Sequence, residues 1–213
     1  ALGIAGLGLP YLPSNVPASK RALVELAGSA LWSLYAQRED EVKALFPKLV
    51  AEYPKEPGVH YLDGISLVAD RPDAARVQFE EELKVNPSNA SARIQIAMLD
   101  IMAGNSSHAI PLAREALRLE PRNPLAHEVL GRAYMDTDQL PRAVPELEAA
   151  AKFAPNNPQT HFYLERGYRR VGRLADAKKQ RAEFDRLRAA EQPTVYSDQM
   201  TTSRKGAVSG VFR

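Results

Sequence analysis

The sequence predicts an all-α fold, a solenoid of stacked antiparallel helix pairs, on the basis of two repeating series. Prolines recur at nearly constant intervals, at Pro54, Pro87, Pro121 and Pro155. Alanines at 75, 109, 143 and 177 repeat the same spacing. A fixed period of about 34 residues is typical of repeat proteins, in which each unit buries its apolar face against its neighbours.

Each period divides into two predicted helices. Residues 90–103 carry apolar side chains at helical spacing, and Gly104 then signals a stop. A second apolar helix is expected from about 108 to 119, ending before Pro121 because proline cannot continue a helix. We expect Pro111 and Pro141 in or near the first turns of their helices, where a missing N–H costs little.

The residues at the expected helix crossings follow a family pattern. In the third period they are Leu130, Gly131, Tyr134, Ala143, Leu147, Ala150 and Pro155. At these positions the chain resembles the tetratricopeptide repeat family. The resemblance implies a right-handed superhelical solenoid with four repeats, at 57–89, 90–123, 124–157 and 158–192. A degenerate helical hairpin at 18–56 precedes them, and non-repeat arms flank the whole at 1–17 and 193–213.

Composition and motifs exclude most catalytic classes. The chain has no cysteine, which rules out disulfide scaffolds, zinc fingers, iron–sulfur clusters and thiol catalysis. The formal net charge of +2 gives no reason to expect nucleic acid as a partner. His60, His127 and His161 share one repeat position, and equivalent positions in stacked hairpins are expected about 10 Å apart, too far to share a metal ion. The sequence therefore predicts no catalytic residue, no cofactor and no metal site, and the protein is not expected to be an enzyme.

Two aspartates depart from the family pattern, and one tryptophan lies outside the repeats. Asp63 and Asp100 stand where the family buries apolar groups, so each is expected either to pair with a basic neighbour or to mark a local opening. Trp32, the single tryptophan, is expected to be a packing residue in the degenerate hairpin.

The segment 1–13 contains no charged side chain, and it is too short to span a bilayer. Because no apolar run long enough for a transmembrane helix occurs elsewhere, no membrane span is predicted. The start also lacks the basic residues of a signal peptide, so either a leader has been removed or the chain has been cut. An exported protein, periplasmic or extracellular, is favoured over a cytoplasmic one.

Two hypotheses for function remain open. In the first, the protein is a non-catalytic scaffold that assembles with itself, head to tail, into an oligomer or fibre. Its terminal arms would dock on the next copy through Leu2, Ile4, Leu7, Leu9, Val211 and Phe212. Opposite charges support this order, because residues 51–100 carry 5 basic and 9 acidic side chains and residues 161–190 carry 9 and 4. Both arms packing on their own domain is the simpler alternative.

In the second hypothesis, the protein is a monomeric adaptor that binds an extended acidic and apolar peptide. By the family's geometry, the first helix of each repeat lines a concave groove. The expected groove residues are Ile94, Met98, Met102, Arg132, Phe162, Arg166, Arg169 and Arg170. The Lys and Asn set with which some family members clamp chaperone tails is missing, since Ile94, Glu128 and Phe162 stand in the Lys place.

Overall fold

The computed structural model describes residues 1–10 and 12–191, and every regular element among them is a helix. The predicted all-α fold class is therefore confirmed. Short elements come first: α1 (Leu2–Gly6) and the 3-10 turn η1 (Pro13–Asn15). The longer helices are α2 (Ala18–Tyr35), α3 (Glu39–Glu52), α4 (Val59–Leu67), α5 (Pro72–Val85), α6 (Ala90–Met102), α7 (Ser106–Leu119), α8 (Pro124–Asp136), α9 (Leu140–Phe153), α10 (Pro158–Arg170) and α11 (Leu174–Glu191).

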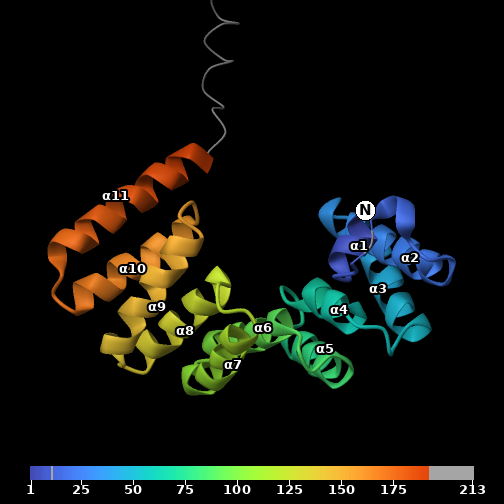
Figure 1. Cartoon of the computed structure of the whole chain (residues 1–213), viewed down its shortest axis with the longest axis horizontal. Helices are drawn as coiled ribbons and strands as arrows, with labels where there is room; N and C mark the ends of the chain where they lie inside the picture. The colour runs from blue at the N-terminus through green and yellow to red at the C-terminus, as the bar shows by residue number, and fades with distance from the viewer. Residues whose placement is uncertain (11, 192–213) are drawn as a thin grey trace, which may run out of the picture.

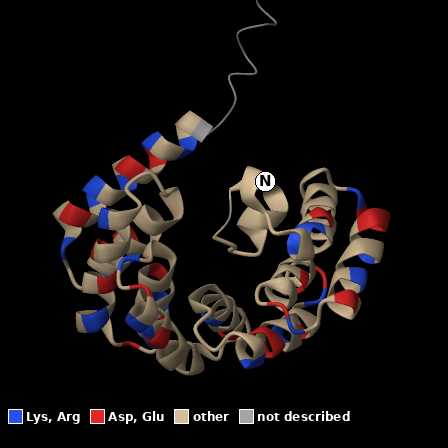
Figure 2. Ribbon diagram, turned by 45° about the vertical axis from the view of Figure 1, so that its right-hand side comes forward, with Lys and Arg blue, Asp and Glu red and all other residues tan. Residues whose placement is uncertain are grey.

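Consecutive helices pack in pairs along the chain (Figure 1). We call α2 and α3 the N-terminal hairpin, and α4–α5, α6–α7, α8–α9 and α10–α11 repeats 1 to 4. The pairs form an open arc, with the first helix of each repeat toward its inner side and the second toward its outer side (Figures 1 and 2). Within the described residues, repeats 1 to 3 each have a helix pair on both sides and repeat 4 has one on one side, and the arc leaves one concave face.

Equivalent asparagines start three of the inner helices. Asn89, Asn123 and Asn157 each accept a backbone N–H of the following helix through the side-chain oxygen, at 2.9, 3.1 and 3.0 Å. Such N-caps satisfy one of the N–H groups that have no partner within the helix. The local sequence thus fixes where α6, α8 and α10 begin.

Prolines also lie within the outer helices. Pro141 is in the first turn of α9, as expected. Pro111 lies inside α7, and the expectation for it is wrong because α7 already begins at Ser106, earlier than predicted. Pro47 and Pro145 lie inside α3 and α9. A proline inside a helix removes one backbone hydrogen bond, so packing against neighbouring helices must hold these segments in shape.

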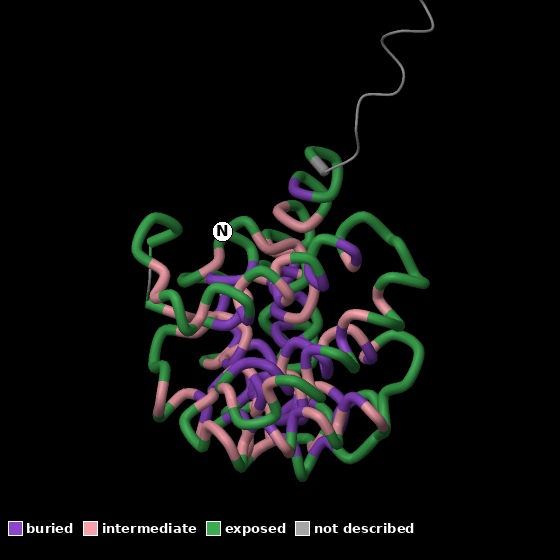
Figure 3. The backbone as a smooth tube through the Cα atoms, turned by 90° about the vertical axis from the view of Figure 1, so that its right-hand side faces the viewer, coloured by how far each residue is buried: buried purple, intermediate pink, exposed green. Residues whose placement is uncertain are grey.

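Small residues let the paired helices approach closely. Ala75, Ala109 and Ala143 are completely buried at equivalent crossings. At Gly131 there is no room for even one more carbon, because a Cβ would lie 2.6 Å from Cγ of Leu147. The buried backbone accordingly follows the interior of the stacked helices (Figure 3). One apolar cluster extends through repeats 2 to 4, a second joins repeat 1 to α6, and a third joins the N-terminal hairpin to the arm and to α4.

The N-terminal arm packs on its own chain. Gly3 lies so close to α2 that a Cβ there would meet the Val24 carbonyl oxygen. Ile4 and Leu7 are buried, and Leu7 belongs to the cluster of the N-terminal hairpin. Leu9 is half-buried and Leu2 is exposed. The C-terminal arm, with Val211 and Phe212, lies outside the described residues.

Candidate interaction surface

One repeat position marks the inner face of all four repeats. Ile65, Met98, Arg132 and Arg166 recur with the period of the repeats and lie on α4, α6, α8 and α10. Ile65 lines a pocket that α1 and the start of α6 also border, which places this position on the concave side. The side chain changes from aliphatic to Met and then to Arg along the arc, so the face is apolar toward the N-terminus and basic toward the C-terminus.

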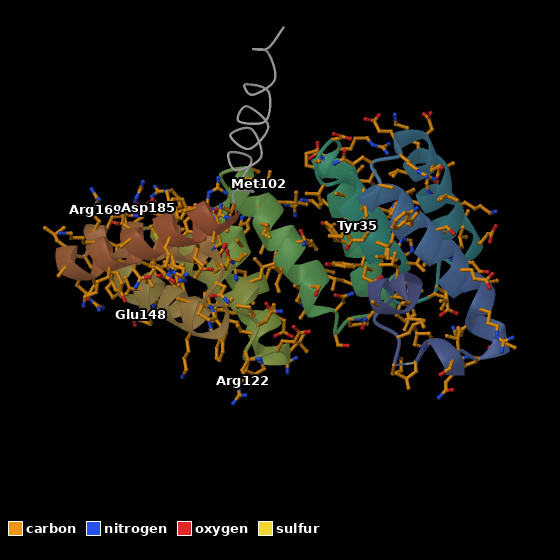
Figure 4. All side chains as sticks on the ribbon, turned by 90° about the horizontal axis from the view of Figure 1, so that it is seen from above. Tyr35, Met102, Arg122, Glu148, Arg169 and Asp185 are labelled. Atoms are coloured by element: carbon orange, nitrogen blue, oxygen red, sulfur yellow. The ribbon has the colours of Figure 1, made fainter. Side chains whose placement is uncertain are left out.

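The apolar part centres on this pocket, which has a volume of about 700 Å³. Leu2, Leu7 and Leu9 of the N-terminal arm and Tyr35 of α2 line one side. The turn before α6, from Asn86 to Ser91, lines the other. Tyr35 is 72% exposed, and Met102 at the end of α6 is 68% exposed. Figure 4 shows Tyr35 on the N-terminal side of the open middle of the molecule and Met102 at its border.

The basic part of the face consists of four arginines, at positions 132, 166, 169 and 170, which differ in whether their guanidinium groups already contact other residues. Arg169 pairs with Glu165, one turn earlier on α10. Arg170 donates to the Met135 carbonyl oxygen at 2.6 Å and to Asp138 at 2.8 Å. Arg169 is therefore engaged within α10, and Arg170 ties repeat 4 to repeat 3.

The other two arginines lie over aromatic rings. The Arg132 guanidinium lies 4.4 Å from the ring centre of Tyr163, and that of Arg166 lies 5.7 Å from Phe162. Arg166 is exposed, and no carboxylate among the described residues lies within ion-pair distance of it. Arg132 also has no ion pair among the described residues but is half-buried, so Arg166 is the more accessible of these two charges.

Other predicted groove residues are placed as follows. Met98 and Phe162 are half-buried and Met102 is exposed, so all three are accessible. Ile94 is only 1% exposed, and in this conformation it cannot contact a partner. Its side chain belongs to the core of repeats 2 to 4 because that turn of α6 packs against the neighbouring repeat.

A buried carboxylate stands in the middle of the inner face. Glu128 of α8 accepts a hydrogen bond from the Thr160 hydroxyl at 2.5 Å, and the Asn157 amide lies 3.4 Å away. Burial raises the pKa of this carboxyl, while the bond from Thr160 and the nearby Arg132 act in the opposite direction. Glu128 therefore joins repeats 3 and 4 and is not a contact for ligands.

The three equivalent histidines make equivalent structural contacts. Nε2 of His60, His127 and His161 lies 2.9, 3.1 and 2.8 Å from the carbonyl oxygen of the proline that closes the preceding unit. Nδ1 of each lies 2.7 Å from a side-chain oxygen of the partner helix, on Gln78, Glu146 and Gln180. Each ring thus links a helix pair to the turn before it.

The described residues contain no group of three His, Asp or Glu side chains placed to hold a metal ion. Asp100 is paired with Arg76 of the neighbouring helix, the first of the two expected outcomes. No helix in the described part of the chain is long and apolar enough to cross a membrane.

Sequence reasoning missed the exposed aromatic residues of α2. Trp32 was expected to pack, but it is 55% exposed, and Tyr35 one turn later is exposed as well. Helix α1 packs against α2, and Tyr35 lines the same pocket as Leu2 of α1, so how far Tyr35 is exposed depends on tertiary contacts. The degenerate hairpin carries no family pattern that would have revealed this.

Comparison with known proteins agrees with the repeat geometry. A sequence profile described as Tetratricopeptide repeat matches residues 101–161, which run from the end of α6 into α10. The chain contains tetratricopeptide repeats. A search of curated protein sequences finds no match.

Solved structures with the same fold include several MamA proteins. A MamA RS-1 ArsTM double mutant superposes with a TM-score of 0.67 at 17% identity, over 81% of this chain and 97% of that chain. MamA 41-end from Desulfovibrio magneticus RS-1 gives a TM-score of 0.66 at 18% identity, over 81% and 98%. Another MamA crystal structure covers 89% of this chain and 98% of its own, with a TM-score of 0.63 at 14% identity. At these identities the likeness establishes the tetratricopeptide-repeat solenoid alone.

Proposed function

We propose that this protein is a non-catalytic interaction scaffold whose concave face binds an extended polypeptide with an apolar and an acidic part. The tetratricopeptide-repeat fold supports the general role of a protein-interaction scaffold. The observation that carries the finer proposal is the unpaired charge of Arg166, displayed beside Phe162 at one end of a face that is apolar at the other.

The apolar part and the basic part of the concave face together indicate the kind of partner that would bind. Exposed Tyr35 at the pocket and exposed Met102 at the far end of α6 provide adaptable apolar contact area. Arg166 can donate two parallel hydrogen bonds to a carboxylate, because its guanidinium makes no such bond within the described chain. An extended peptide suits a surface built from parallel helices, where successive side chains meet successive repeats.

Peptide selection on the full-length chain tests the proposal. Peptides selected from a random library should be enriched in Asp or Glu at one end and in apolar residues at the other. Arg166→Ala should weaken their binding about 10-fold or more, which corresponds to ~1.4 kcal/mol. The matched control is Arg114→Ala, because Arg114 is also exposed but lies on the outer helix α7. Equal affinities of the two variants would exclude recognition by the concave face.

Self-association is the second candidate, and the two ends of the solenoid favour it. Trp32 and Tyr35 are exposed on the N-terminal hairpin, and Leu174 is exposed on repeat 4. Capping units normally present polar outer surfaces, so apolar residues at both ends suit contact between copies. The acidic first half and the basic last repeat favour a head-to-tail order.

In this second proposal, the N-terminal arm would have to leave its own hairpin before it could dock on another copy. Light scattering on the full chain and on a Trp32→Ser variant tests self-association, because Trp32 is exposed and does not line the pocket that the arm borders. A concentration-dependent increase in mass that the variant loses would support it. A monomer at all concentrations would leave the adaptor as the remaining proposal.

A further inference from the structure

A second pocket lies between α3 and α4, at the edge of the solenoid where the loops within the helix pairs are found. Its volume is about 660 Å³. Most of its wall is apolar, formed by Leu34, Val42, Phe46, Pro47, Ile65, Leu67 and Ala69. An apolar cavity of this size with a few polar groups is typical of a binding site for a small ligand or an anchoring side chain.

In the later repeats, side-chain hydrogen bonds join neighbouring helix pairs at this edge of the solenoid, and between α3 and α4, as far as the structure describes the chain, they do not. Ser106 donates to Asp136 at 2.8 Å and joins repeats 2 and 3, and Arg170 donates to Asp138 and joins repeats 3 and 4. Within the described part of the chain, no hydrogen bond or ion pair joins α3 to α4. Away from this edge the two helices pack through apolar side chains, with Phe46 and Leu49 of α3 in one buried cluster with Leu62 of α4.

The polar groups of the pocket carry a surplus of negative charge. Asp63 lines it and is only 6% exposed, in the repeat position that Leu130 occupies in repeat 3. Glu39 and Asp70 stand at the rim together with Lys43 and Arg71. Lys43 already pairs with Glu39, which leaves Asp63 and Asp70 opposite the single cation Arg71.

The Asp63 side chain is buried, and no lysine or arginine among the described residues lies within ion-pair distance of it. Burial raises the pKa of its carboxyl, opposed by His60, Arg71 and the Ser66 hydroxyl. His60 is engaged by Gln78 and by the Pro54 carbonyl oxygen, and thus does not fill the pocket. A positively charged group entering from solvent would stabilise the ionised carboxylate.

We propose that this pocket binds the C-terminal segment of the chain, residues 207–213, with Phe212 between α3 and α4 and Arg213 beside Asp63 and Asp70. The segment contains Val208, Val211 and Phe212, and the nearby basic residues are Arg204, Lys205 and Arg213. Apolar side chains next to cations match an apolar pocket with surplus carboxylate.

The length of the chain after α11 permits this contact. The segment 192–213 follows Glu191, and in extended form it reaches roughly 70 Å at about 3.3 Å per residue. Helix α11 ends on the open side of the arc, on which the N-terminal hairpin also borders (Figure 1). The segment can therefore reach the pocket of its own chain or that of a second copy.

Disulfide trapping in the full-length chain tests the proposal, and the absence of native cysteine makes it unambiguous. Ala69→Cys with Val211→Cys places one thiol at the pocket and one in the segment. Lys152→Cys with Val211→Cys is the control, because Lys152 is exposed on the outer helix α9. We expect the pocket pair to form its disulfide at least about 10-fold faster under mild oxidation, since docking raises the effective concentration.

Further variants separate recognition from chance collision. Adding Phe212→Ser or Asp70→Asn to the pocket pair should lower its rate toward that of the control, and an excess of cysteine-free peptide 204–213 should do the same. A cross-linked monomer would show binding within one chain and a cross-linked dimer binding between copies; both support the proposal. Equal rates for the pocket pair and the control pair would overturn it, provided that circular dichroism shows both to be folded.

Discussion

The glycines of the inner helices allow a sharp test of the packing, because two of them differ only in the space around them. Gly131 in α8 and Gly167 in α10 are both buried and helical. A Cβ at Gly131 would lie 2.6 Å from Cγ and 2.9 Å from Cδ2 of Leu147, a completely buried side chain. A Cβ at Gly167 would meet its nearest atoms at 3.5 Å, an ordinary contact distance. We therefore expect the same substitution to have opposite effects.

The expected change in the free energy of unfolding is the sum of two opposing contributions. Replacing Gly by Ala inside a helix stabilises it by about 1 kcal/mol. Overpacking a rigid core costs about 1–3 kcal/mol. Gly167→Ala gains the first term alone and should raise the free energy of unfolding by up to ~1 kcal/mol. Gly131→Ala carries both terms and should be less stable than Gly167→Ala by about 1–3 kcal/mol.

Urea unfolding followed by circular dichroism measures both variants against the parent chain, and the slope of the transition shows whether the repeats still unfold together. Gly64→Ala provides a second crowded site, because a Cβ there would lie 2.5 Å from the Phe79 ring. It should behave like Gly131→Ala. Equal stability changes at all three glycines would refute the close approach of the paired helices.

Three more predictions concern single contacts. Ala143→Leu should overpack a fully buried crossing and lower the free energy of unfolding by about 1–3 kcal/mol in the urea assay. Glu82→Ala should cost about 3 kcal/mol, because the buried carboxylate accepts bonds from the Gly58 N–H and from Asn89, and a thermal melt of the variant checks this. Glu128 has a raised pKa in the folded state, so the folded chain holds this proton to higher pH than the unfolded chain does. The contribution of Glu128 to the free energy of unfolding should therefore decrease as pH rises above the ordinary carboxyl pKa of 4.5. Urea unfolding at a series of pH values should show this decrease in the parent chain and not in Glu128→Gln.

The repeats were predictable because one local rule recurs. Alanine at each crossing has the same physical role in every period, and so has the asparagine before α6, α8 and α10, so these positions recur at the spacing of the repeats. Ile94 shows the limit of that reasoning, since the exact turn of α6 that faces the next repeat depends on the packing angle. The N-terminal hairpin lacks the repeated pattern, and there the docking of α1 and the pocket between α3 and α4 depend on tertiary contacts. Trp32 and the pocket beside Asp63 were therefore beyond prediction from sequence.

The position of α1 has a practical consequence. Its first residues lie on the inner side of the arc, where Leu2 borders the same pocket as Ser91 and Glu120 (Figure 2). Any polypeptide joined ahead of Ala1, whether an affinity tag, a fluorescent protein or a natural extension, would emerge beside the surface proposed for the partner. Such a fusion would act as a tethered competitor at high local concentration. Labels for binding studies are better attached on the outer helices, for example at Lys152, where they would leave the concave side free.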